Sequence, residues 1–121
     1  MSQQQTVLIV DDDPQILRLV ERMLGARKVN VLVAPRPSAA LEICYRQAVD
    51  LLISDIVMPE MDGIKLAERV LKLHPGAQVL LISGQAREAP TLSKARRLHF
   101  LRKPFFPAQL IACLHELLPE V

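Results

Sequence analysis

The sequence predicts an α/β fold in which a parallel sheet is covered by helices on both faces. Short apolar runs rich in Val, Ile and Leu alternate with segments whose apolar residues recur at helical spacing. Strands that are apolar along their whole length are typical of parallel sheets buried on both sides. A length of 121 residues and a hydrophobic content of 50% suffice for one packed domain, which we expect to span residues 1–121.

Five apolar runs supply the predicted strands, and the last of them is the weakest. They are Val7 to Val10, Val29 to Ala34, Leu51 to Ser54, Val79 to Ser83 and His99 to Arg102.

The first predicted helix carries clear signals at both ends. Asp13 followed by Pro14 is typical of an N-cap with proline at the first helical position, and Gly25 closes the helix. Pro37 and Pro107 open two further helices in the same way.

The remaining helices are predicted from spacing. Residues 64–71 and 110–118 place apolar side chains on one helical face, which would cover the sheet. Between Gln85 and Leu98, Pro90 interrupts the pattern, so we expect a short or irregular helix there.

Composition excludes several classes of protein. A formal net charge of +2 is too small to indicate nucleic-acid binding by this domain. No stretch approaches the ~20 apolar residues that cross a bilayer, and residues 1–5 lack the basic and apolar parts of a signal peptide. We therefore expect a soluble cytoplasmic protein without membrane association.

Polar side chains follow four of the predicted strands. The acidic triplet Asp11–Asp13 follows the first strand, Asp55 the third, Ser83 ends the fourth and Lys103 follows the fifth. In a doubly wound parallel sheet, ligands bind at the carboxyl ends of the strands. Each residue alone has a plainer explanation, such as a helix-dipole charge, a turn hydroxyl or a surface ammonium. Their joint occurrence at successive strand ends favours one shared site.

The charges at this edge predict a metal ion. Three carboxylates, from Asp11, Asp12 and Asp55, meet one ammonium, from Lys103. About two negative charges remain uncompensated, which a divalent cation with oxygen ligands would match. Mg²⁺ is the natural candidate.

Four segments together resemble the receiver domain of two-component response regulators. They are Val7 to Pro14, Leu52 to Gly63, Leu81 to Gly84 and Lys103 to Phe105. The resemblance covers essentially the whole chain. It implies a flavodoxin-like three-layer α/β/α sandwich with five parallel strands in the order 2-1-3-4-5 and five helices. It also implies a phosphorylation-dependent signalling switch.

The resemblance assigns roles to the polar edge. Asp55 would accept a phosphoryl group from a sensor histidine kinase or a histidine phosphotransfer protein. Asp12 and Asp55 would bind Mg²⁺ directly, Asp11 chiefly through water, and Val57 through its backbone carbonyl. Lys103 would pair with Asp55 and then with a phosphoryl oxygen, and a cis peptide before Pro104 would aim its side chain.

The resemblance also implies residues for the conformational switch and for the lifetime of the acyl phosphate. The Ser83 hydroxyl would turn toward the phosphoryl group and Phe100 would reorient with it, although packing alone also explains an aromatic residue there. The fourth helix, fifth strand and fifth helix would form the output face. Val57 and Gln85 occupy positions that tune hydrolysis of the acyl phosphate. Apolar Val57 cannot orient water, which predicts slow self-dephosphorylation unless Gln85 holds the water instead.

The region before the last strand departs from the family pattern. Only twenty positions separate Ser83 from Lys103, which is shorter than the family leads us to expect. A basic cluster in this region is either a partner surface or a solvated face. Its members are Lys94, Arg96, Arg97, Arg102 and Lys103.

Two alternatives fit less well. A phosphatase of the haloacid dehalogenase type needs an Asp-x-Asp pair, but Val57 stands two residues after Asp55. A degenerate receiver that only binds would lack Asp55, Asp12 or Lys103, and all three are present. We therefore expect self-phosphorylation and self-dephosphorylation chemistry without enzymatic turnover. The downstream effector is not indicated, and a phosphorylation-linked homodimer is compatible with the sequence.

Overall fold

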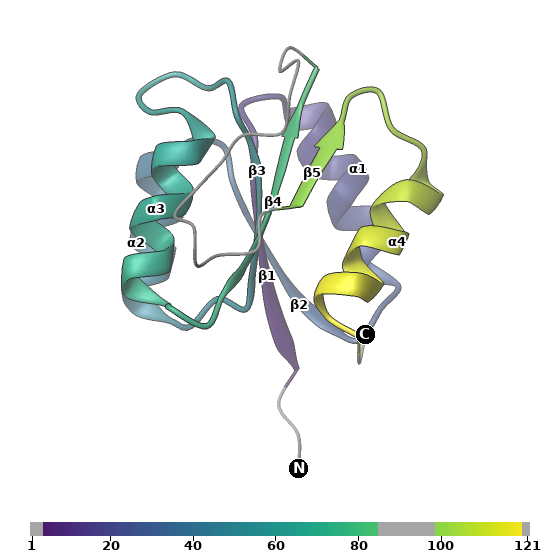
Figure 1. Cartoon of the computed structure of the whole chain (residues 1–121), viewed down its shortest axis with the longest axis horizontal. Coiled ribbons are helices and arrows are strands. Elements are labelled where there is room, and N and C mark those ends of the chain that lie inside the picture. The colour runs from purple at the N-terminus through teal and green to yellow at the C-terminus, as the bar shows by residue number, and fades with distance from the viewer. Residues whose placement is uncertain (1–3, 85–98, 120–121) are drawn as a thin grey trace.

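The computed structural model describes residues 4–84 and 99–119 and contains a five-stranded parallel sheet in the order β2-β1-β3-β4-β5 (Figure 1). The predicted strand order is therefore confirmed. The strands are β1 (Gln5–Val10), β2 (Val29–Ala34), β3 (Leu51–Asp55), β4 (Gln78–Ser83) and β5 (His99–Arg102).

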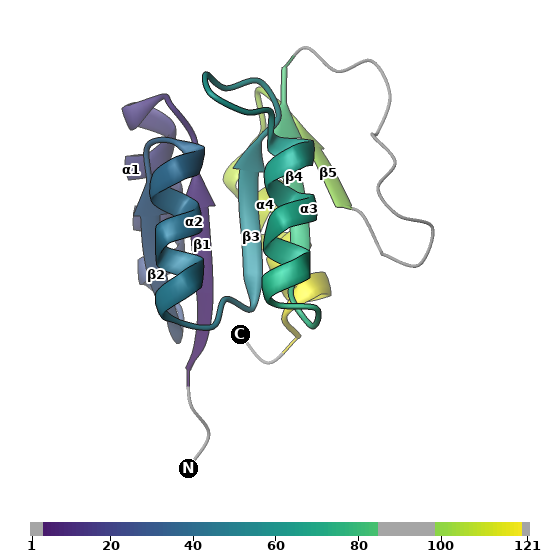
Figure 2. The ribbon, with the colours of Figure 1, turned by 90° about the vertical axis from the view of Figure 1, so that its left-hand side faces the viewer.

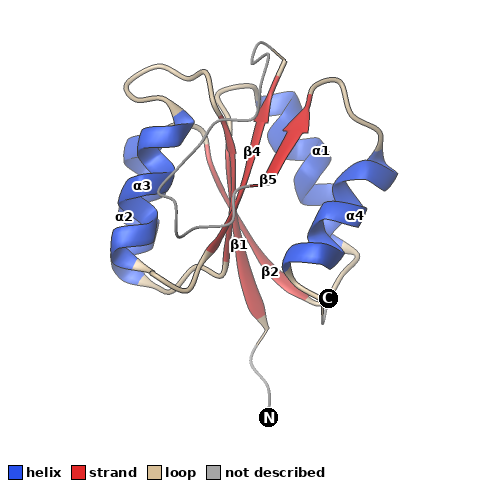
Figure 3. Ribbon diagram, viewed as in Figure 1, coloured by secondary structure: helices blue, strands red, loops and turns tan. Residues whose placement is uncertain are grey.

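Helices cover both faces of this sheet. They are α1 (Pro14–Gly25), α2 (Pro37–Arg46), α3 (Gly63–Leu73) and α4 (Pro107–Leu117). Figures 1 and 2 show α2 and α3 on one face and α1 and α4 on the other, and Figure 3 shows the three layers by colour. The three-layer sandwich is confirmed. The short helix predicted between Gln85 and Leu98 lies outside the described residues, so α4 is the helix predicted as the fifth.

The two faces of the sheet build two separate cores. Leu8 and Leu52 pack with residues of α2 and α3, whereas Ile9 and Ile53 pack with residues of α1 and α4. Neighbouring side chains of a strand point to opposite faces, so an apolar run without alternation fills both cores. Full burial of each such side chain contributes about 2 kcal/mol.

An aspartate caps the N-terminal end of α1, and another caps the N-terminal end of α3. The Asp13 carboxylate accepts a hydrogen bond from the backbone N–H of Gln15 (2.9 Å), which confirms the predicted N-cap. The Asp62 carboxylate caps α3 in the same way through the N–H of Lys65 (2.8 Å). Sequence reasoning missed this second cap.

Within residues 4–84 and 99–119, no helix has the length and apolar character needed to cross a membrane.

Candidate functional site

Three carboxylates meet at the carboxyl edge of the sheet. Asp11 follows β1 and Asp55 ends β3, and these strands are neighbours. One carboxylate oxygen from each of Asp11, Asp12 and Asp55 lies within 4.8 Å of the others. Asp11 and Asp55 are buried, with exposed fractions of 2% and 8%, whereas Asp12 is exposed. The cluster predicted from the strand ends is thus assembled in the fold.

Lys103 supplies the positive charge of this site. Its Nζ lies 3.0 Å from Oδ2 of Asp11 and 3.5 Å from Oδ2 of Asp55. The ammonium is therefore shared, and the shorter contact is the one to Asp11. The backbone N–H of Lys103 donates to the carbonyl of Ser83 (3.2 Å), and the peptide bond to Pro104 is cis, as the resemblance implied.

The pKa values of the two central groups reflect this crowding. Burial raises the pKa of Asp55 and the charge of Asp11 raises it further, while Lys103 and a backbone hydrogen bond from Val57 oppose the rise only in part. Burial alone would lower the pKa of Lys103, but its hydrogen bond and charge interactions with Asp11 and Asp55 raise it overall. Lys103 therefore remains an ammonium. Its single positive charge does not balance the negative charges of the three carboxylates.

The donor set fits Mg²⁺. Carboxylate oxygens are hard ligands, and those of Asp11, Asp12 and Asp55 are close enough together to share one ion. A divalent cation would also relieve the repulsion between Asp11 and Asp55 that raises the pKa of Asp55. These three residues could hold the ion, and the backbone of Val57 lies beside the Asp55 carboxyl group.

Gly63 allows α3 to begin directly against Asp55. A Cβ at Gly63 would overlap the backbone carbonyl oxygen of Asp55 and would lie 2.9 Å from the carbonyl carbon. The N–H of Gly63 donates to the carbonyl of Ile56 (2.8 Å), which closes the loop between β3 and α3. Sequence reasoning assigned no role to this glycine, although its place after Asp62 at the start of a helical pattern was a usable signal.

The predicted switch residues lie on β4 and β5. Ser83 ends β4 and is buried, with an exposed fraction of 1%. Phe100 is half-buried opposite Leu81, packs against the core on the α2 and α3 side, and lies 5.8 Å from the guanidinium of Arg102. Gln85 lies outside the described residues, as do Lys94, Arg96 and Arg97.

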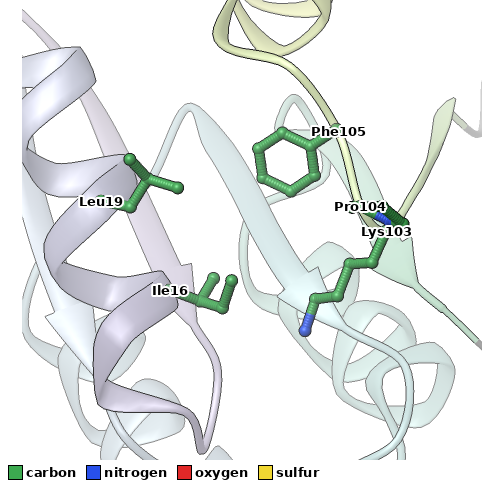
Figure 4. A pocket seen from close by; sticks show the side chains of 5 residues that line it. All are labelled: Ile16, Leu19, Lys103, Pro104 and Phe105. Atoms are coloured by element: carbon green, nitrogen blue, oxygen red, sulfur yellow. The ribbon is translucent and has the colours of Figure 1, made fainter.

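An open pocket of about 330 Å³ lies beside the site, between α1 and the segment after β5. Figure 4 shows Ile16 and Leu19 of α1 facing Pro104 and Phe105, with the side chain of Lys103 along one wall. The stem of Lys103 therefore lies against apolar surface, while its ammonium reaches the carboxylates.

Comparisons with known proteins show which family the chain belongs to. Residues 7–115 match the family model described as the response regulator receiver domain. The response regulator receiver protein CpdR of Brucella abortus (strain 2308) is 32% identical, over 93% of this chain and 95% of CpdR. The sensor kinase CckA of the same strain is 36% identical over 95% of this chain, which corresponds to 13% of CckA.

A solved structure gives the same result for the fold. The CheY-like response regulator receiver domain protein from Methanospirillum hungatei JF-1 superimposes with a TM-score of 0.84 at 27% identity, over 98% of this chain and 96% of that chain. The chain therefore belongs to the response regulator receiver domain family and is a domain of phosphorylation-dependent two-component signalling.

Proposed function

We propose that Asp55 is the phosphoacceptor of this receiver domain. The observation that carries the proposal is its position: a buried carboxylate that ends a central strand, within 4.8 Å of two further carboxylates and 3.5 Å from an ammonium. A nucleophile of this kind reacts only if the phosphoryl oxygens it approaches are neutralised.

The chemical step is an in-line phosphoryl transfer. A carboxylate oxygen of Asp55 attacks the phosphorus of a phosphohistidine, so that a P–O bond forms while the P–N bond breaks and the imidazole leaves. Asp12, Asp55 and the carbonyl of Val57 would hold Mg²⁺ directly and Asp11 chiefly through water, and the bound ion would neutralise phosphoryl oxygens. Lys103 moves from its contact with Asp55 to a phosphoryl oxygen. The product is an acyl phosphate on Asp55.

The proposed conformational switch depends on Ser83, which lies on β4, the strand beside β3. Its hydroxyl donates to a phosphoryl oxygen once the group is present, and Phe100 moves into the volume that Ser83 leaves. This shifts the population between two packings of β4 and β5. The output face then includes β5 and α4, which are the described part of the face expected from the sequence.

The partner that fits this chemistry is a sensor histidine kinase or a histidine phosphotransfer protein. Receiver domains take their phosphoryl groups from histidine kinases, and the relatives include a sensor kinase and a response regulator receiver protein. We infer a cytoplasmic domain spanning residues 1–121 whose phosphorylation alters its contacts with a downstream effector or a second copy of itself.

One assay tests the phosphoacceptor directly. The protein is incubated with Mg²⁺ and acetyl phosphate or phosphoramidate, and intact mass spectrometry is expected to show a stable gain of about 80 Da, one phosphoryl group. The variant Asp55→Asn should lose this gain. Asp13→Asn is the matched control, since it removes an exposed acid of the same edge and asparagine caps helices as well as aspartate does.

Other outcomes of this assay would contradict the proposal. An unmodified wild type, or an adduct that persists in Asp55→Asn, would refute the assignment of Asp55. Continuous release of phosphate without an accumulating adduct would indicate a phosphatase instead of a switch.

A further inference from the structure

Glu60 adopts a backbone conformation that is unusual for its side chain. It lies in the loop between β3 and α3, five residues after Asp55, with φ of 73°. Among residues 4–84 and 99–119 it is the one non-glycine residue with positive φ. The left-handed region is disfavoured for residues with a Cβ, so a geometry of this kind requires contacts that hold it in place.

The strain is local to a very tight turn. The N–H of Met61 donates to the carbonyl of Pro59 (2.8 Å), across Glu60. A hydrogen bond between residues two apart, with a central φ near +75°, matches the rare form of γ-turn. Met58 and Met61 flank this turn, and both pack against the core on the α2 and α3 side. The chain must therefore reverse within Pro59 and Glu60.

The side chain of Glu60 ties the turn to the start of α2. Its Oε1 accepts from the backbone N–H of Ser38 (3.1 Å) and its Oε2 from the Ser38 hydroxyl (3.3 Å). Ser38 lies in the first turn of α2, and the N-cap residue Arg36 makes no capping bond with its own side chain. Glu60 thus supplies from a distant loop the acceptor that α2 lacks, at the positive end of the helix.

The same loop carries a backbone ligand of the proposed metal site. Val57 precedes Met58, and its backbone already contacts the Asp55 carboxyl group. A change in the turn at Glu60 would shift Met58 and with it the peptide that bears the Val57 carbonyl. Hydrogen bonds that orient a metal ligand from outside the coordination sphere commonly govern affinity.

We propose that Glu60 is a positioning residue: by binding Ser38 it maintains the γ-turn and so sets the Val57 carbonyl for Mg²⁺. The inference rests on the proposed function, because it assumes that Val57 is a ligand. Glu60 itself touches neither the metal nor the phosphoryl group.

The test measures Mg²⁺ binding by isothermal titration calorimetry in the absence of any phosphodonor. Glu60→Ala is expected to weaken Mg²⁺ affinity roughly tenfold, at the lower end of the effect of residues that orient metal ligands. In phosphorylation with phosphoramidate, the Mg²⁺ concentration for half-maximal rate should rise by the same factor, while the rate at saturating Mg²⁺ changes little. Glu42→Ala, which removes an exposed acid of α2, is the control and should leave affinity unchanged.

A second variant separates positioning from capping of α2. In Arg36→Ser/Glu60→Ala the helix regains an N-cap side chain, and the net charge equals that of the wild type. We expect the midpoint of thermal unfolding to recover while Mg²⁺ affinity stays weak. Recovery of the affinity as well, or wild-type affinity in Glu60→Ala, would overturn the proposal.

Failure of this inference can be told apart from failure of the proposed function. If the wild type gains no phosphoryl group on Asp55, the proposed function falls, while the calorimetric comparison still decides on Glu60. If Asp55 is phosphorylated normally and Glu60→Ala binds Mg²⁺ as the wild type does, only the role of Glu60 falls.

Discussion

Asp55 is buried at a cost to the folded protein, and this cost sets the sign of its mutational effect. Its pKa in the folded state is raised from the ordinary 3.8, so between that value and the higher folded value the folded protein holds more protons than the unfolded chain. The contribution of the Asp55 carboxyl group to folding stability is therefore fully present below pH 3.8. It is lost as the pH rises through the pKa that this group has in the folded protein. At neutral pH the charged form destabilises the metal-free protein.

Replacement of Asp55 by asparagine should consequently stabilise the metal-free protein at pH 7, because it removes a buried charge repelled by Asp11. Mg²⁺ should narrow or reverse this difference in stability between the two proteins. Free ion at about 100 times its Kd adds about 2.7 kcal/mol to the free energy of unfolding of a protein that binds it. Thermal unfolding of both proteins in EDTA and in MgCl₂ measures this. A wild type more stable than Asp55→Asn in EDTA would contradict it.

The side chain at position 57 should affect the lifetime of the acyl phosphate on Asp55. Val57 is 50% exposed and its backbone hydrogen-bonds to the carboxyl group of Asp55, but its side chain offers no group that could hold an attacking water. Val57→Asn should therefore speed hydrolysis of the acyl phosphate, by up to roughly 100-fold, the lower range for a positioned polar group. Loss of the mass adduct over time provides the measurement.

The control for this experiment is Val57→Ala, which removes apolar bulk without adding a hydrogen-bonding group. An unchanged lifetime in Val57→Asn would contradict the prediction. Equal shortening in both variants would show that bulk matters instead of the orientation of water, and would leave Gln85 as the remaining candidate for that role.

Single residues differ in how far sequence reveals them. Asp11, Asp55 and Lys103 stand at the ends of apolar runs, where a charge is costly, so their pattern in the sequence is enough to predict a shared site. Glu60 gives no such signal, because its role depends on a positive φ and on Ser38, which lies 22 residues away in sequence. The unequal sharing of Lys103 between Asp11 and Asp55 likewise depends on side-chain geometry.

At the scale of elements, the junction between β3 and α3 is controlled by Gly63. Any side chain there meets backbone atoms of Asp55 and Ile56, which cannot turn aside as a flexible side chain can. Gly63→Ala should destabilise the protein by about 2 kcal/mol, a typical cost of overpacking, and should slow phosphorylation by displacing Asp55. Urea unfolding and the rate of adduct formation measure the two effects.

Gly76→Ala is the matched control, because a Cβ at Gly76 has no heavy atom within 4 Å. It should leave both quantities near those of the wild type. Equal destabilisation by the two substitutions would mean that loss of glycine flexibility, and not contact with Asp55, is responsible.

The predicted elements agree with the structure wherever apolar patterning decides them. The second and fifth strands have the predicted bounds, while β1 begins two residues before the predicted strand and β3 includes Asp55. These extra residues are polar, and hydrogen bonding to a neighbouring strand extends pairing beyond the apolar run. A tertiary contact of this kind leaves no trace in local composition.

At the scale of the whole molecule, two neighbouring strand pairings connect the carboxylate edge to the outer strand β5. Asp55 pairs with Ile82, next to Ser83, and the pairing of β4 with β5 aligns Leu81 with Phe100. Ser83 and Phe100 therefore lie on adjacent strands, and Phe100 packs on the core that α2 and α3 cover. A change at Asp55 has a short physical route to the outer strand.

Phosphorylation of Asp55 should change the surroundings of Phe100 by way of Ser83. With fluorine-labelled phenylalanine, the ¹⁹F signal of Phe100, assigned by Phe100→Leu, is expected to shift when Asp55 is phosphorylated. In Ser83→Ala the mass adduct should still form, but the shift at Phe100 should be smaller or absent, because no hydroxyl follows the phosphoryl group. Unphosphorylated Ser83→Ala gives the reference signal. A full shift in phosphorylated Ser83→Ala would show that the coupling bypasses Ser83, and an unmoved Phe100 in the wild type would place the output elsewhere.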